Sequence, residues 1–258
     1  MQVQETFKRV EDKYRLTRSQ ACEVINRICD HVHEDDYFQY TVHSIYYDSP
    51  DCSLVVAGLN GGNYKAKLRM RGYNEVSGDS PVFLETKKKY ENIVYKKRMQ
   101  MTNDEAFPYM VSKDRNEAAT NTAQEIEYMR DHYRLVPKVL ISYDRICFAA
   151  DREQDVRVTF DTHIRYRIHD LDDMNDNGTE IPLEEDSVML EIKAMDRYPM
   201  WLVRILSEMK LRRTSFSKYA TVYRRHRNEM APVMDYPAAA GVPAVIPAKE
   251  NQLCSLQF

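Results

Sequence analysis

The sequence predicts an α+β domain built on a large antiparallel sheet, and two observations lead to this class. Strand-like segments outnumber helical ones and follow one another without a long linker. Several of them alternate apolar with charged residues, which is the pattern of strands that bury one face only. With 258 residues, 43% hydrophobic and 30% charged, the chain suffices for one large domain. We expect this domain over residues 1–227 and a disordered, proline-containing tail over residues 228–258.

The individual elements follow from periodicity and turn residues. Period-two segments predict strands over residues 7–16, 38–48, 64–73, 82–90, 93–101, 138–149, 156–160 and 188–194. The loop "NEVSGDSP" and the turn "YEN" join the third, fourth and fifth of these as two hairpins. Apolar residues at helical spacing predict helices over residues 17–33, 116–133, 199–210 and 217–228. The first helix opens with a capping box, Thr17 with Gln20.

One strand, "YKAKLRMRGY" at residues 64–73, carries a row of cations. Its alternating positions place four on one face: Lys65, Lys67, Arg69 and Arg71. Like charges about 7 Å apart repel by roughly 0.6 kcal/mol in water, and about four times more at a partly buried site. A solvated face is the simplest interpretation of one such strand, so the question is whether the pattern recurs.

The pattern recurs on other predicted strands. Glu-x-Lys appears three times, as Glu11 with Lys13, Glu85 with Lys87, and Glu191 with Lys193, and two further strands contribute Arg145 and Arg157. So many charged faces are best explained if the sheet curls into a closed barrel with these faces inside and helices outside. Cations crowded in such an interior need a polyanion, and phosphate chains fit Arg and Lys well. The few carboxylates would then hold a hard divalent cation shared with phosphate oxygens.

Composition excludes several other classes. The net charge of -3 argues against a general nucleic-acid binder, and a run of Lys and Arg over residues 65–98 is the clear local exception. Five cysteines without C-x-x-C spacing indicate neither a disulfide framework nor a zinc ribbon, and favour a reducing compartment. No apolar run approaches the ~20 residues of a membrane span, and no signal peptide is evident. We therefore expect a cytoplasmic protein that does not itself insert into a membrane.

The stretch "DMNDNGTEIPLE" matches the spacing of an EF-hand calcium loop through Asp173, Asn175, Asn177, Gly178 and Glu184. However, Glu180 replaces an apolar residue of that motif, and Pro182 stands where the exiting helix would begin. We expect a solvated acidic loop between strands.

Eight sequence words, in order over residues 7–223, together resemble one family: "FKRVEDKYRL", "SIYYDSPD", "KAKLRMRGY", "FLETKKKYENIVYKKR", "SYDRICFA", "RVTFDTHIR", "MLEIKA" and "RTSFSKY". The chain is similar to the VTC (vacuolar transporter chaperone) polyphosphate polymerase domain of the triphosphate tunnel metalloenzyme superfamily. This resemblance implies a closed tunnel of eight antiparallel strands with helices packed outside. In the tunnel, the γ-phosphate of ATP would pass to a growing polyphosphate chain.

The resemblance also implies roles for individual residues. Catalytic cations would be Arg69, Arg71, Lys87, Arg145, Arg157 and Lys218, with further phosphate contacts from Lys13, Lys67 and Lys97 or Arg98. Glu191 would bind Mn²⁺ or Mg²⁺, while Glu11 and Glu85 are either metal ligands or partners of neighbouring cations. The chain departs from the family pattern at Ser215, where a second lysine is expected. It also has no room for a regulatory SPX domain or a membrane module, so a separate membrane protein would be the partner that exports the product.

Two other functions remain open from sequence. A hydrolase of the same superfamily would cut triphosphate or nucleoside triphosphates, but its first strand typically carries E-x-E-x-K, and Arg9 stands at the first Glu. This favours the polymerase-like branch. A non-catalytic polyphosphate-binding module would use the same cations and the same carboxylate.

Overall fold

A single curled sheet organises the protein. The computed structural model describes residues 9–91, 93–112, 120–150 and 156–231. The main path of the antiparallel sheet runs β1-β9-β7-β6-β2-β3-β4-β5, and the short strand β8 pairs with β7. The strands are β1 (Arg9–Thr17), β2 (Val32–Asp48), β3 (Tyr64–Tyr73), β4 (Pro81–Tyr90), β5 (Ile93–Thr102), β6 (Val136–Ala150), β7 (Arg157–Arg167), β8 (Ile181–Pro182) and β9 (Ser187–Met195).

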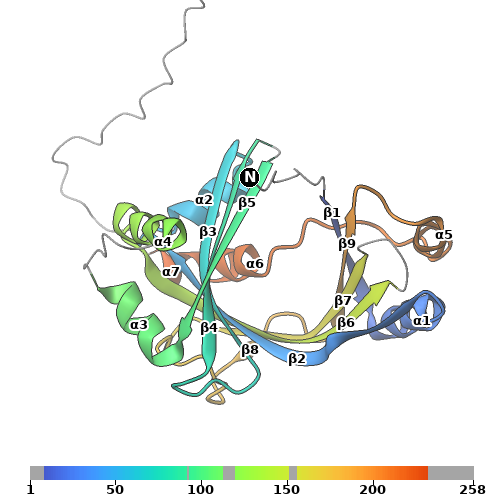
Figure 1. The fold of residues 1–258 in the computed structure, drawn as a ribbon, viewed down its shortest axis with the longest axis horizontal. Helices are drawn as coiled ribbons and strands as arrows, with labels where there is room; N and C mark the ends of the chain where they lie inside the picture. The colour runs from blue at the N-terminus through green and yellow to red at the C-terminus, as the bar shows by residue number, and fades with distance from the viewer. Residues whose placement is uncertain (1–8, 92, 113–119, 151–155, 232–258) are drawn as a thin grey trace, which may run out of the picture.

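The sheet curls into a trough rather than a closed barrel (Figure 1). Within the described residues β1 and β5 form its two edges, so the prediction of a closed eight-stranded tunnel is wrong in strand number and in closure. The segment between α5 (Met200–Glu208) and α6 (Lys218–Arg225) crosses the open side of the trough instead (Figure 1). Thr214 N donates to Lys13 O at 2.7 Å, so this segment occupies the hydrogen-bonding edge of β1 that closure would need.

Four helices cover the convex face of the sheet, and three of them were predicted. On one arm, α1 (Arg18–Ile28) and α5 bury Val24 and Leu202 against Phe160 and other convex residues of β1, β7 and β9. On the other arm, α3 (Asn103–Val111) and α4 (Asn121–His132) cover Leu68 and Leu84. These apolar residues alternate with the charged ones of the same strands, which fixes the charged positions on the concave face.

Helix α6 lies on the concave side, so the prediction that helices pack only outside is wrong for this element (Figure 1). Its Tyr219 and Val222 pack against Ile141 of β6 and against Val55 of α2 (Ser53–Leu59). The buried carboxylate of Asp48 joins these elements. It accepts hydrogen bonds from Leu54 N and Val55 N at 2.9 Å and from the Tyr219 hydroxyl at 2.8 Å.

Most predicted elements are present, with shifted ends. Strand β2 begins six residues before the predicted start and β7 continues past residue 160 to Arg167. Helices α2 and α3 were not predicted, although the Thr102–Glu105 capping box at the start of α3 is a readable signal. The predicted start of the second helix, at residue 116, and residues 232–258 of the predicted tail lie outside the described residues, while residues 227–230 form α7 (Arg227–Met230). No helix in the described ranges is long and apolar enough to span a membrane.

Candidate anion-binding site

The register of β3, β4 and β5 aligns the charged residues in rows across the concave face. Lys67 lies opposite Lys87, which lies opposite Lys96. The next row inward is Arg69, Glu85 and Arg98. Like charges directly opposite one another destabilise a sheet. Lys67 Nζ contacts Ser217 Oγ at the start of α6, at 3.3 Å, which places the row of cations predicted from residues 64–73 inside the trough.

Glu85 is the only carboxylate in these rows, and it is 3% exposed. Four cations share it: Arg69 Nη2 at 2.6 Å, Lys96 Nζ at 2.8 Å, Arg98 Nε at 3.7 Å and Arg71 Nη1 at 3.8 Å. Burial raises the pKa of the Glu85 carboxyl, but Arg69, Arg71 and Lys96 outweigh burial and lower the pKa to about 2. One negative charge among four positive ones leaves this arm with an excess of positive charge.

On the other side of α6, Asp161 of β7 is a second buried carboxylate that is shared by two cations. The Arg145 guanidinium donates to both carboxylate oxygens of Asp161, from Nε to Oδ1 at 2.6 Å and from Nη2 to Oδ2 at 2.9 Å. Lys218 Nζ lies 2.5 Å from the same Oδ2. The carboxylate is fully buried. Burial raises the pKa of Asp161, and the charges of Lys218 and Arg145 lower it to below its usual value. Sequence analysis did not identify Asp161 as a site residue, because the helix that brings Lys218 to it is placed only by the tertiary fold.

Two tyrosines connect the cations of β3 to the rest of the site. Arg69 Nη1 donates to the Tyr46 hydroxyl at 3.2 Å, and Arg71 Nη2 donates to the Tyr143 hydroxyl at 3.4 Å. Burial raises the pKa of the Tyr46 phenol, but Arg69, Arg71 and Lys67 outweigh burial and lower the pKa to about 7. Sequence analysis missed both tyrosines, since a tyrosine on a strand ordinarily indicates packing.

The carboxylates of β1 and β9 meet at Lys13. Its Nζ is 3.7 Å from Glu11 Oε1 and 3.7 Å from Glu191 Oε2. Glu191 also pairs with Lys193. Burial raises the pKa of Glu191, but Lys193 and Lys13 dominate and hold it well below its usual range. Glu11 Oε2 lies 3.8 Å from Lys87 Nζ of β4, an ion pair that spans the two arms of the trough.

This pair of carboxylates is the part of the site that fits a divalent cation. Across the described ranges no cluster of three or more His, Cys, Asp or Glu residues could hold a metal alone. Glu11 and Glu191 already flank one positive charge, the Lys13 ammonium. Mg²⁺ is commonly held by one or two carboxylates together with substrate phosphates. The residues therefore fit an ion shared with phosphate, and not a closed protein site.

The remaining predicted residues fall in different places. Lys97 points to the convex side, where its Nζ lies 2.9 Å from Glu125 Oε2 of α4, so Arg98 occupies the concave position of that pair. Arg157 is half-exposed near the start of β7 and pairs with Asp35 at 3.2 Å. The structure thus brings together Arg69, Arg71, Arg98, Arg145, Lys218, Lys67, Lys87, Lys13, Glu11, Glu85 and Glu191 on one face, and leaves Lys97 outside it.

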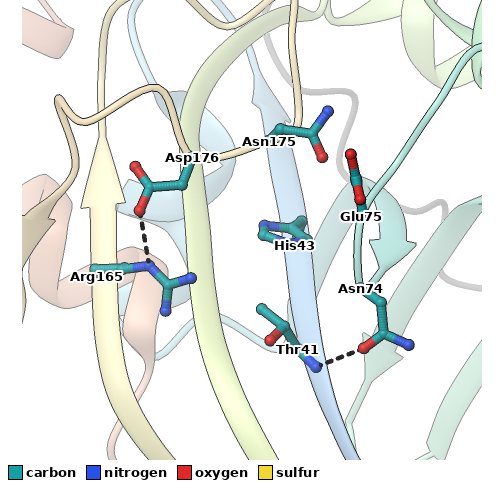
Figure 2. A pocket seen from close by; sticks show the side chains of 7 residues that line it. All are labelled: Thr41, His43, Asn74, Glu75, Arg165, Asn175 and Asp176. Carbon is teal, nitrogen blue, oxygen red and sulfur yellow. Dashed lines mark hydrogen bonds and ion pairs between the residues drawn. The ribbon is translucent and has the colours of Figure 1, made fainter.

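A polar pocket of about 500 Å³ lies on the opposite face of β2, lined by the seven residues drawn in Figure 2. His43 Nδ1 lies 2.9 Å from Ser142 Oγ, and Arg165 Nε lies 2.7 Å from Glu180 Oε2 and 3.8 Å from Asp176 Oδ2. Because the Arg165 charge is compensated by carboxylates, the pocket lacks the positive excess of the concave face.

The EF-hand-like stretch forms one wall of this pocket, through Asn175 and Asp176 (Figure 2). Arg167 donates to the backbone oxygens of Asp170 at 3.0 Å, of Asn175 at 2.6 Å and of Asp173. The backbone carbonyl oxygens of this loop therefore bind the guanidinium group of Arg167.

These features place the protein in a class defined by a curled antiparallel sheet. On the concave face of this sheet cations outnumber carboxylates, which suits the face to bind anions. The VTC domain family matches residues 8–226, and the chain belongs to this family. No curated protein matches the sequence.

Three solved structures are similar in fold at low identity. A candidate adenylyl cyclase from Hippeastrum, described as having a dominant triphosphatase activity, is 13% identical with a TM-score of 0.48, and the match covers 84% of this chain and 96% of that one. The PH1819 protein from Pyrococcus horikoshii is 12% identical with a TM-score of 0.46, covering 84% and 99%. A candidate adenylate cyclase from Vibrio parahaemolyticus is 13% identical with a TM-score of 0.45, covering 85% and 99%.

Proposed function

We propose that the protein is a metal-dependent phosphotransferase that moves the γ-phosphate of ATP onto a polyphosphate chain at the concave face. One observation carries the proposal: four cations from β3 and β5 converge on the single buried carboxylate of Glu85. Such an excess of positive charge, largely buried at Arg69 and Arg71, is costly in the empty protein and is relieved by a polyanion. Membership of the VTC family supports a phosphate chain as that polyanion.

The chain's own residues would bind and orient the phosphates. Arg71 and Arg145 present guanidinium groups, which grip phosphate oxygens bidentately. Lys218 enters from α6 between the two arms, where its charge now neutralises Asp161. Asp161 and Glu85 hold these cations in position in the absence of substrate, which limits the reorganisation that binding requires.

A divalent ion would lie with Glu11 and Glu191, where it would neutralise charge on the phosphate oxygens during transfer. Lys13 would then turn from these carboxylates toward the phosphate chain. The Lys87–Glu11 ion pair links this end of the trough to β4, which supports a single site in which the metal ligands and the phosphate ligands would act together.

A triphosphate hydrolase is the second candidate, and the half-exposed Glu11 favours it, because a solvent-accessible carboxylate could orient an attacking water. A non-catalytic polyphosphate-binding module would use the same cations. Purified protein incubated with ATP and Mn²⁺ distinguishes the three. Long phosphate chains on a gel indicate transfer, free phosphate alone indicates hydrolysis, and tight polyphosphate binding without turnover indicates a binding module.

A further inference from the structure

The tip of the β4–β5 hairpin is a surface that the proposed function does not use. We define the tip by four described residues: Tyr90, Ile93, Val94 and Tyr95. Their exposed fractions are 54%, 52%, 49% and 55%. Isoleucine and valine are usually buried in the protein interior, and tyrosine is usually at least partly buried. Figure 1 shows this end of β5, with the neighbouring end of β3, projecting at the rim of the sheet. Exposed apolar side chains that cluster in this way ordinarily mark an interaction surface.

The exposed apolar side chains of the tip lie mainly on the convex face of the hairpin, and Val94 adds one on the concave face. Ile93 and Tyr95 alternate with Val94, so they point to opposite sides of β5. Tyr90 lies across from Ile93 in the register, and Tyr64 of β3, 41% exposed, lies next to Tyr90. The convex face of the tip therefore presents an exposed apolar surface, and the concave face presents Val94 beside two lysines. A lipid interface, which combines an apolar interior with anionic headgroups, suits this combination.

Two lysines lie level with Val94 in the tip. Lys65 and Lys89 face each other across β3 and β4. The other cations of the hairpin already have carboxylate partners: Lys87, Lys96 and Arg98 pair within the anion-binding site, and Lys88 and Lys97 pair with Glu125. From residue 86 to residue 102 the only acid is Glu91. The charges of Lys65 and Lys89 therefore complement an anionic surface, which attracts nearby lysines.

We propose that the hairpin tip docks the protein on an anionic lipid surface. Ile93 and Val94 enter the headgroup region, and Tyr90 and Tyr95 lie at its boundary, where amphipathic rings are favoured. Lys65 and Lys89 contact lipid phosphates, which relieves their mutual repulsion. Antiparallel pairing of β5 with a second copy in the register centred on Lys97 would bring Lys96, Lys97 and Arg98 against the same residues, which disfavours that arrangement.

Flotation with vesicles tests this proposal. The full chain should float with vesicles of phosphatidylcholine and phosphatidylserine, but not with phosphatidylcholine alone, and high salt should weaken the binding. A variant carrying Ile93→Ser with Val94→Ser should lose about tenfold in vesicle affinity, since it removes two apolar side chains from the lipid. Val111→Ser is the matched control: Val111 is 81% exposed at the end of α3, and its substitution should not change flotation.

The outcome is separable from the proposed function. Turnover of ATP without vesicles should be equal in the wild type and in the double serine variant, because neither substituted residue lies in the anion-binding site. Failure of the wild type to float with anionic vesicles overturns the proposal, and leaves an acidic protein surface as the occupant to be tested. Equal flotation of the wild type and of the double variant also overturns it.

Discussion

Replacement of Arg71 by alanine separates an anion-binding concave face from an ordinary solvated one. The Arg71 side chain is 10% exposed and donates to Ser44 Oγ at 3.2 Å and to the Tyr143 hydroxyl at 3.4 Å. Its ion pair with Glu85 is long, at 3.8 Å, and Glu85 keeps three closer or equivalent cations without it. The substitution therefore removes a positive charge from the site without leaving a buried carboxylate unpaired.

The expected magnitudes follow from these contacts. Loss of cation repulsion offsets the loss of two hydrogen bonds, so the free energy of unfolding of the empty protein should change by no more than about 1 kcal/mol. A charge-assisted hydrogen bond is worth about 1.5–3 kcal/mol, so affinity for tripolyphosphate should fall roughly ten- to a hundredfold. Arg71→Lys should also weaken binding, because an ammonium cannot grip phosphate bidentately.

Calorimetric titration with tripolyphosphate at low and high ionic strength measures these changes. Lys97→Ala is the control, since it removes an equal charge from the neighbouring strand segment but from the convex side, where Lys97 pairs with Glu125. It should cost no more than about threefold in affinity at low salt and nothing at high salt. The reasoning is refuted if both variants lose the same affinity and salt erases both losses.

Three further predictions test other parts of the site. Glu191→Gln should abolish metal-dependent turnover while the variant remains folded; wild-type turnover across metal concentrations would remove Glu191 from the mechanism. The Tyr46 phenol should titrate near pH 7, so the tyrosinate absorbance of the wild type should rise around neutral pH, should fall when tripolyphosphate neutralises the nearby cations, and should be missing in Tyr46→Phe. Burial, with a smaller contribution from Arg165, lowers the pKa of His43 to about 4, so the neutral imidazole stabilises the fold above pH 6.5 and this stability is lost as pH falls. Between pH 6.5 and 4.5 the free energy of unfolding should drop by about 2 kcal/mol more in the wild type than in His43→Gln, and parallel denaturation curves would contradict this.

Sequence alone determined the class of fold and the charged face of each strand. Alternation in "YKAKLRMRGY" and in the three Glu-x-Lys segments placed the charged residues on one side, because a strand's side chains point alternately to its two faces. The eight sequence motifs, which occur in the order of the family, indicated the VTC family. The match of the family over residues 8–226 confirms this. Sequence could not choose between Lys97 and Arg98 as phosphate ligands, since adjacent residues on a strand are distinguished only by which face is buried.

Only the tertiary structure determined which side chains lie next to one another on the charged faces. The partnership of Asp161 with Arg145 depends on the register of β6 with β7, and its partnership with Lys218 depends on a helix 57 residues away. The four-cation arrangement at Glu85 exists only because β3, β4 and β5 pair in one register. The open trough could not be predicted either: whether the edge of β1 pairs with another strand or with Thr214 depends on competition among distant segments for the same backbone hydrogen bonds, and periodicity within one segment carries no information about that competition.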